Sequence, residues 1–170
     1  SFVGLQEDFD YSVIPHKDSD PTQGVTTFDL ILLRRHILAQ ATLDSPYKWI
    51  AADANKSGTL TTLDMLLLRK LILNVDNELA QNTSWRFVDA EYRFPASETP
   101  LTVNLPEVKN INDRVGEEVA DFVAVKIGDL NGSAMGGLEP RSSRAYELEL
   151  EGAPVLRAGE TYQIGVKAHG

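Results

Sequence analysis

The feature that most constrains this chain is an internal repeat. Residues 26–38 read TTFDLILLRRHIL and residues 61–73 read TTLDMLLLRKLIL, so eight of thirteen positions are identical at an offset of 35 residues. Self-similarity at a fixed period indicates one structural unit that is used twice, with the copies burying apolar faces together. The fold must therefore accommodate two equivalent elements before anything else.

Each copy is predicted to be a helix. Thr and Asp at its start supply capping chemistry, and Arg or Lys toward its end complements the helix dipole. Besides a regular apolar stripe, Ile31 and Leu32 are apolar in the first copy, and Leu66 and Leu67 match them in the second. This arc is too wide for a helix with one buried face. We therefore expect a second cover from the twin helix, the rest of the chain or a partner.

The loop before the second helix, DANKSGTLTTLD at residues 53–64, has the spacing of a calcium loop. Oxygen-bearing side chains stand at positions 1, 3, 5, 9 and 12, and glycine stands at position 6, where such a loop turns sharply. Ca²⁺ is a hard cation that takes about six to eight oxygens. The expected ligands are Asp53, Asn55, Ser57, Thr59 through its carbonyl, and Asp64. The alternative is a polar turn that leads into a capped helix.

The loop before the first helix, DSDPTQGVTTFD at residues 18–29, keeps the same oxygen spacing. Its expected ligands are Asp18, Asp20, Thr22, Gly24 and Asp29. Position 6 is glutamine, however, and the glycine is displaced by one position. We therefore predict a distorted or weaker calcium site here, with a metal-free turn as the alternative.

Two calcium loops, each followed by one helix, resemble the dockerin family, in which such a unit is duplicated. The core resemblance covers residues 18–74. The wider set GVTTFDLILLRRHIL, NTSWRFVDAEYRFP and DFVAVKIGDLNG is similar to the dockerin-like segment of large secreted surface or adhesin-type proteins of Bacteroidetes. The resemblance implies Ca²⁺ at two sites, an extracellular location on the bacterial cell surface, and a binding or structural role.

One departure from the family pattern concerns partner recognition. Cellulosomal dockerins typically carry a Ser-Thr pair at loop positions 10 and 11 that reads the cohesin. These positions hold Thr27-Phe28 and Thr62-Leu63 in this chain. The difference argues against docking onto a cellulosomal cohesin and against a link to carbohydrate degradation.

The expected fold class is α+β, a dockerin-like pair of loop–helix repeats packed with a β-strand segment. Residues 1–135 would form the calcium-binding domain with its β extension, residues 136–144 a linker, and residues 145–170 the first strands of a β-sandwich-like domain. A short helix is predicted at Tyr47–Ala52. Strands are predicted at Ser84–Val88, Leu101–Leu105 and Val119–Ile127. The aromatic residues of that region are expected in the core, with a carbohydrate-stacking surface as the alternative.

A third group of oxygen-bearing residues follows the last predicted strand. Asp129, Asn131 and Ser133 repeat the offsets 1, 3 and 5, but the twelfth position counted from Asp129 is Pro140, so no downstream carboxylate closes the loop. We interpret these residues as a polar turn at the end of a strand. Another metal loop is the alternative.

Composition excludes several function classes. The chain has 16 basic and 25 acidic residues, a net charge of −9, and it lacks the basic stripe of a nucleic-acid binder. Without cysteine it has no disulfides and no thiolate sites. Its apolar runs are far below the ~18–20 residues of a membrane span. The three histidines are scattered and no hydrolase or phosphate-binding motif is present, so we expect no enzyme.

Three non-catalytic hypotheses follow. The chain is a calcium-stabilised structural or adhesion module of a large secreted surface or filament protein, with neighbouring β-domains or self-assembly as its contacts. Alternatively it is a dockerin-type interaction module docking on a cohesin-like β-domain, or the targeting appendage of a secreted polysaccharide hydrolase. The first is favoured and predicts that the chain's own β segment covers the helical faces. The second predicts an exposed apolar helix face.

Overall fold

The computed structural model describes residues 8–95, 99–113, 115–116 and 119–135. Three consecutive helices, α1 (Thr27–Ile37), α2 (Pro46–Ala52) and α3 (Thr62–Ile72), follow one short strand in the described part, and the other strands come after them. The α+β expectation is confirmed. The predicted linker at 136–144 and the predicted strands of 145–170 lie outside the described residues.

The two repeat helices form as predicted, and their N-termini are built identically. Thr26 and Thr61 adopt extended backbone as N-caps, and each pairs with the aspartate three residues later in a reciprocal capping box. Such a box satisfies the free amide groups of the first turn, which no intrahelical carbonyl can reach. The two copies of the repeat therefore share the same capping hydrogen bonds as well as similar sequences.

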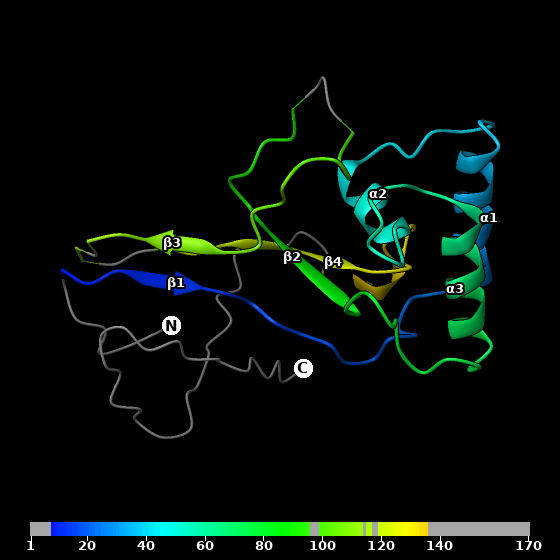
Figure 1. Cartoon of the computed structure of the whole chain (residues 1–170), viewed down its shortest axis with the longest axis horizontal. Coiled ribbons are helices and arrows are strands. Elements are labelled where there is room, and N and C mark those ends of the chain that lie inside the picture. Colours follow the sequence, from blue (N-terminus) through cyan, green and yellow to red (C-terminus); the bar gives the residue numbers. More distant parts are fainter. Residues whose placement is uncertain (1–7, 96–98, 114, 117–118, 136–170) are drawn as a thin grey trace.

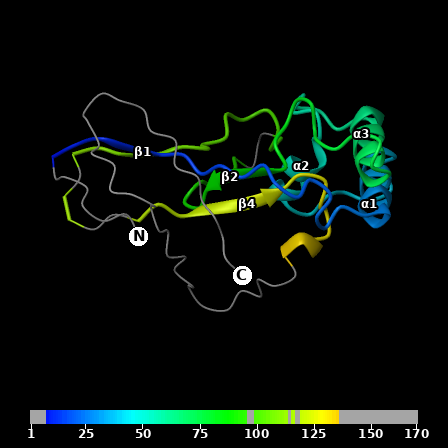
Figure 2. The same ribbon diagram turned by 90° about the horizontal axis from the view of Figure 1, so that it is seen from below.

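The strands form two separate antiparallel pairs. β2 (Trp85–Asp89) pairs with β4 (Phe122–Lys126), and β1 (Tyr11–Val13) pairs with β3 (Lys109–Ile111). The helices lie at one end of the molecule, β1 and β3 lie at the other, and β2 and β4 lie between them (Figures 1 and 2). A 3₁₀ helix, η1 (Ser133–Met135), ends the described chain.

The predicted strand at Leu101–Leu105 is wrong. Thr102 donates its backbone N–H to the carbonyl of Thr99 at 3.1 Å, which makes a turn there. Prolines at positions 100 and 106 flank the segment and have no N–H to give to a ladder. Alternating apolar residues in this stretch therefore pack on the core edge without pairing.

The core joins the inner faces of the helices to the β2–β4 pair. Leu33 of α1 and Leu68 of α3 are fully buried, together with Ile50 of α2. The strand side contributes Val88, Val125 and Ile127 to the same cluster. The expectation of core aromatics is met in part: Tyr92 and Phe94 pack against this cluster with ring centroids 5.0 Å apart, whereas Trp85 is buried outside it and Phe87 is half-buried.

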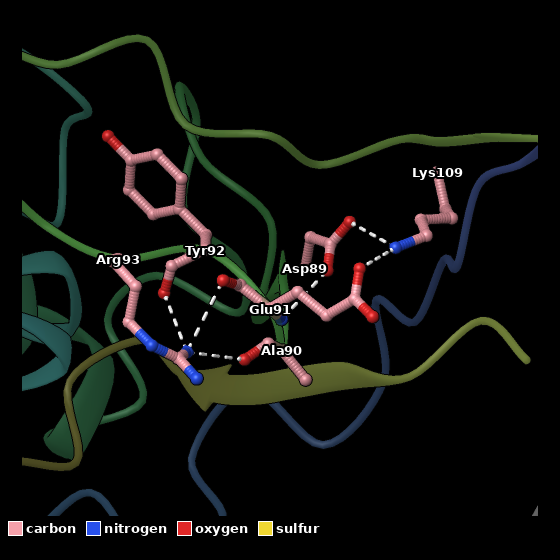
Figure 3. Close-up of polar contacts among 6 residues, drawn as sticks. All are labelled: Asp89, Ala90, Glu91, Tyr92, Arg93 and Lys109. Carbon is pink, nitrogen blue, oxygen red and sulfur yellow. Dashed lines mark hydrogen bonds and ion pairs between the residues drawn. The ribbon is translucent and has the colours of Figure 1, made fainter.

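A polar turn after β2 ties the two strand pairs together. The Lys109 ammonium at the start of β3 contacts the carboxylates of Asp89, at 3.3 Å, and Glu91 (Figure 3). Arg93 folds back and donates to the carbonyls of residues 90–92. A hydrogen bond from the Glu91 amide, followed by Lys109, lowers the pKa of Asp89, and the hydrogen bond to Glu91 raises the pKa of Lys109. These charges fix the turn without entering the core.

Candidate functional site

The loop between α2 and α3 gathers all five residues predicted for it. Asp53 is the C-cap residue of α2, and its buried carboxylate accepts the amide N–H of Ser57 on Oδ1 at 2.9 Å and that of Gly58 on Oδ2 at 2.8 Å. Gly58 has φ of +78°, which permits the sharp turn expected at position 6. The loop is thus wound around the first carboxylate.

The second carboxylate of this loop comes from the first turn of α3. Asp64 is fully buried, and its Oδ2 accepts the amide of Thr61 at 2.8 Å, while its Oδ1 faces the amide of Asn55 at 3.4 Å. The Ser57 hydroxyl contacts the carbonyl of Thr59 at 3.1 Å. Helix capping therefore also positions the closing carboxylate of the loop.

The donor set of this loop fits a hard divalent cation. It consists of two carboxylates, one amide oxygen, one hydroxyl and one backbone carbonyl, which are the ligand types that calcium loops use. Asp53 and Asp64 are buried, and none of the ion pairs among the described residues involves either of them. Buried charges without a countercharge are costly unless a metal or hydrogen bonds compensate them. Since the described part holds no cluster of three or more acidic, His or Cys side chains, a bound cation would depend on this mixed oxygen set.

The two halves of the first predicted loop, residues 18–23 and 24–29, have different surroundings in the structure. Gly24 and Asp29 occupy positions that match Thr59 and Asp64, and Asp29 makes the same capping contacts to Thr26 at 2.8 Å. Its Oδ1, however, accepts amides from outside the loop, those of Leu130 at 2.9 Å and Asn131 at 3.2 Å. The distant contacts of Asp29 could not be read from the spacing of residues 18–29.

Asp18, Asp20 and Thr22 are not brought together with Asp29 by any described hydrogen bond. All three are exposed, and Asp18 accepts the amide of Ser84 at 2.7 Å. Asp20 lies in the left-handed region with φ of +53°. The first half of the predicted loop is therefore hydrogen-bonded to the strand region and makes no described hydrogen bond to Asp29.

A buried lysine lies beside this displaced segment. Lys126 of β4 donates to the carbonyls of Pro21 at 2.7 Å and Ile127 at 3.0 Å. Burial lowers its pKa to about 8, against the opposing attraction of Asp129, Asp18 and Asp20. The ammonium thus holds the 18–22 segment to the sheet through a backbone carbonyl.

The outer faces of α1 and α3 form an exposed apolar surface. Equivalent residues of the repeat are exposed in pairs: Phe28 with Leu63, Ile31 with Leu66, and Leu38 with Leu73. The two helices pack side by side, and β2 and β4 lie on their inner side (Figure 1). We call these six residues the outer helix surface. The repeat therefore continues on the solvent side of the helices as well as in their caps.

The expected cover of the wide helical faces by the β segment is only partly found. Leu32 and Leu67 are half-buried against the core, whereas Ile31 is 51% exposed and Leu66 is 49% exposed. The difference arises because the core packs against the side of the apolar arc that carries Leu32 and Leu67, whereas the side that carries Ile31 and Leu66 stays in solvent. Among the alternatives, an exposed apolar helix face is the arrangement that the interaction hypothesis predicts.

Comparison with known proteins assigns the repeat region to a family. Residues 17–73 match the dockerin type I domain. The searches of curated proteins and of solved structures gave no significant match. Within the described residues no helix combines the length and apolar character that crossing a bilayer requires. The duplicated loop–helix units, their capping aspartates and this match together identify residues 17–73 as a dockerin type I domain.

Proposed function

We propose that this chain is a calcium-stabilised, non-catalytic interaction module that docks through the outer helix surface onto a cohesin-like β-domain outside the cell. The exposure of equivalent apolar residues on both repeat helices carries the proposal. Contiguous exposed apolar surface on a soluble protein marks an interaction site more often than chance. The dockerin assignment supplies the class of partner.

The chemistry of the outer helix surface describes the partner face. Each helix presents apolar residues at its positions equivalent to Phe28 and Ile31, followed by an exposed or half-buried basic residue, Arg35 in α1 and Lys70 in α3. The partner should therefore offer an apolar centre with acidic groups at its edge. Phe28 stands at loop position 11, where a cellulosomal dockerin would carry a hydroxyl, so the complementary position should be apolar.

Calcium would support this function through folding. Asp53, Asn55, Ser57, Thr59 and Asp64 would hold the ion in the loop that leads into α3. A ligand that binds only the native state stabilises it by mass action. Without the ion the two buried carboxylates repel each other, so the position of α3 beside α1 would be less well defined.

A structural role in a large secreted surface protein is the second candidate. It is supported by the cover that β2 and β4 give to the inner helical faces. This hypothesis does not explain why Ile31 and Leu66 are exposed, and it is therefore less favoured. This second candidate includes a Bacteroidetes origin and a location on the cell surface.

The outer helix surface is tested by measuring calorimetric binding to a panel of purified cohesin domains in calcium. We expect Ile31→Asp together with Leu66→Asp to weaken binding at least tenfold, because two central apolar contacts are replaced by charge. Val119→Asp is the matched control, since Val119 is 70% exposed and is not on a helix. Equal affinity of the double variant and the wild type, or failure of the wild type to bind any cohesin, would contradict the proposal.

A further inference from the structure

The segment 129–134, which follows β4, contacts the start of α1 through Asp29. Leu130 and Asn131 donate their amides to Asp29 Oδ1, and the Ser133 hydroxyl donates to the carbonyl of Gly24 at 2.9 Å. These contacts join residues about one hundred positions apart in the sequence. They place the polar turn after β4 at the site that residues 18–23 would occupy in a continuous loop.

The segment 129–134 is wound like the first half of the loop 53–64. Asp129 accepts Ser133 N on Oδ1 at 3.1 Å and Ala134 N on Oδ2 at 2.7 Å. Asp53 accepts Ser57 N and Gly58 N on the same atoms, at 2.9 and 2.8 Å. The position-4 residues also agree, because Gly132 has φ of +79° and Lys56 has φ of +55°.

The segment 24–29 matches the second half of the loop 53–64. Asn131 N faces Asp29 Oδ1 at 3.2 Å, as Asn55 N faces Asp64 Oδ1 at 3.4 Å. The Ser133 hydroxyl contacts the Gly24 carbonyl, as the Ser57 hydroxyl contacts the Thr59 carbonyl. One loop of twelve positions is thus assembled from two pieces, with the break between positions 6 and 7.

Burial separates this composite loop from the contiguous loop 18–29. Four aspartates are buried in the described part of the chain: Asp29, Asp53, Asp64 and Asp129. They stand at positions 1 and 12 of the loop 53–64 and of the composite loop. Asp18 and Asp20 are exposed. None of the ion pairs of the described residues involves Asp29 or Asp129. Burying such carboxylates is costly unless a cation or hydrogen bonds compensate them.

The break in the loop explains the displaced glycine. Gly58 sits at position 6 and needs its positive φ to turn the chain into position 7. Ala134 sits at the same position without a positive φ, because the chain leaves the site there. Gly24 sits at position 7, where a Cβ would lie 2.4 Å from the backbone nitrogen of Ala134. Glycine is therefore required where the two pieces meet.

We propose that the first calcium site of this domain is composite, with Asp129, Asn131 and Ser133 in place of Asp18, Asp20 and Thr22. The Gly24 carbonyl and Asp29 complete it. The proposal goes beyond the function proposed above but shares its assumption that the loop 53–64 takes calcium, since both sites offer the same five ligands: two carboxylates, an amide oxygen, a hydroxyl and a backbone carbonyl. An ion bound there would cross-link residues 24–29 to residues 129–134.

The test is calorimetric titration of the full chain with CaCl₂. We expect two bound ions in the wild type, one in Asp129→Asn, one in Asp53→Asn, and two in Asp18→Asn. Asparagine keeps an acceptor oxygen for the loop amides but removes the carboxylate charge. Ser133→Ala provides a milder variant, whose exposed side chain is not needed for packing, and it should weaken one site at least threefold.

The outcomes of the titration test the composite site separately from the calcium site in the loop 53–64. Loss of a site in Asp18→Asn, with two sites kept in Asp129→Asn, would overturn the composite site in favour of the contiguous loop. A single ion in the wild type that only Asp53→Asn removes would overturn the composite site and leave the loop 53–64 standing. No bound ion in the wild type would overturn both. Hydrogen exchange at the amides of Leu130 and Asn131 should slow on adding calcium to the wild type and to Asp18→Asn but not to Asp129→Asn.

Discussion

The two repeat units are nearly identical from the cap onward and differ before it. Thr26 with Asp29 and Thr61 with Asp64 make the same capping contacts at the same distances to within a few tenths of an ångström. In the second unit the preceding loop follows α2 directly, whereas in the first unit the segment 129–134 stands in its place. The difference teaches that a helix and its cap are specified locally, while the loop that completes a site can be supplied from elsewhere in the chain.

The largest effect is expected for Asp53→Ala. At calcium 100-fold above the dissociation constant, the loss of mass-action stabilisation is about 3 kcal/mol, and two lost amide hydrogen bonds add about 2 kcal/mol. Urea denaturation in calcium and in chelator separates the two contributions, because only the second persists in chelator. Asp18→Ala is the matched control and should cost about 1 kcal/mol in both conditions, since its partner is the Ser84 amide. A deficit of Asp53→Ala that is the same size in calcium and chelator would show that the loop holds no ion.

The next effect concerns the two glycines of the sites. Gly24→Ala places a Cβ against the backbone of Ala134 at 2.4 Å and also strains a residue with φ of +71°, so we expect a loss of about 3 kcal/mol. Gly58→Ala meets only the Leu101 carbonyl at 3.4 Å and should cost about 1 kcal/mol from its positive φ. Chemical denaturation of both variants measures the difference. Equal losses would mean that residues 24 and 134 do not meet closely.

The smallest effect is a pH dependence that only the first unit should show. Lys126 has a pKa of about 8 in the folded protein and about 10.5 unfolded, so the unfolded chain binds more protons between these values. The stability of the wild type should therefore rise by about 2 kcal/mol from pH 8 to 10.5. Asp129, Asp18, Asp20 and Lys17 are the charged groups that act on it. Lys126→Met should lack this rise, and identical pH profiles of the two proteins would contradict it.

The repeat helices were predictable because their signals are local. Capping residues, apolar spacing and terminal charges all lie within the thirteen residues of each copy, and the observed helices end within a residue or two of the prediction. The sharp turn of the loop 53–64 at Gly58 was predictable for the same reason, whereas calcium binding by its oxygens stays a prediction. The short helix was also found, with its start at Pro46.

The rest depended on contacts between distant segments. A linear count from Asp129 puts the closing position at Pro140, whereas the carboxylate that accepts the Asn131 amide belongs to Asp29, upstream in the chain. The resemblance of DLNGS to DANKS was the available signal, but a linear count cannot show a loop whose second half precedes its first. The pairing of β1 with β3 was missed because three-residue strands carry too little pattern. Leu101–Leu105 misled because apolar alternation alone does not show which backbone amides are free to pair.

The hydrogen bonds from Leu130 and Asn131 to Asp29 have a consequence for the order in which the domain matures. As a chain emerges from a ribosome or an export channel, α1 appears early, but the groups that complete its start appear about one hundred residues later. Contacts of such long sequence separation form late and slow folding. The loop hydrogen bonds of the second unit need only residues 53–64, whereas those of the first unit need nearly all of the described segment.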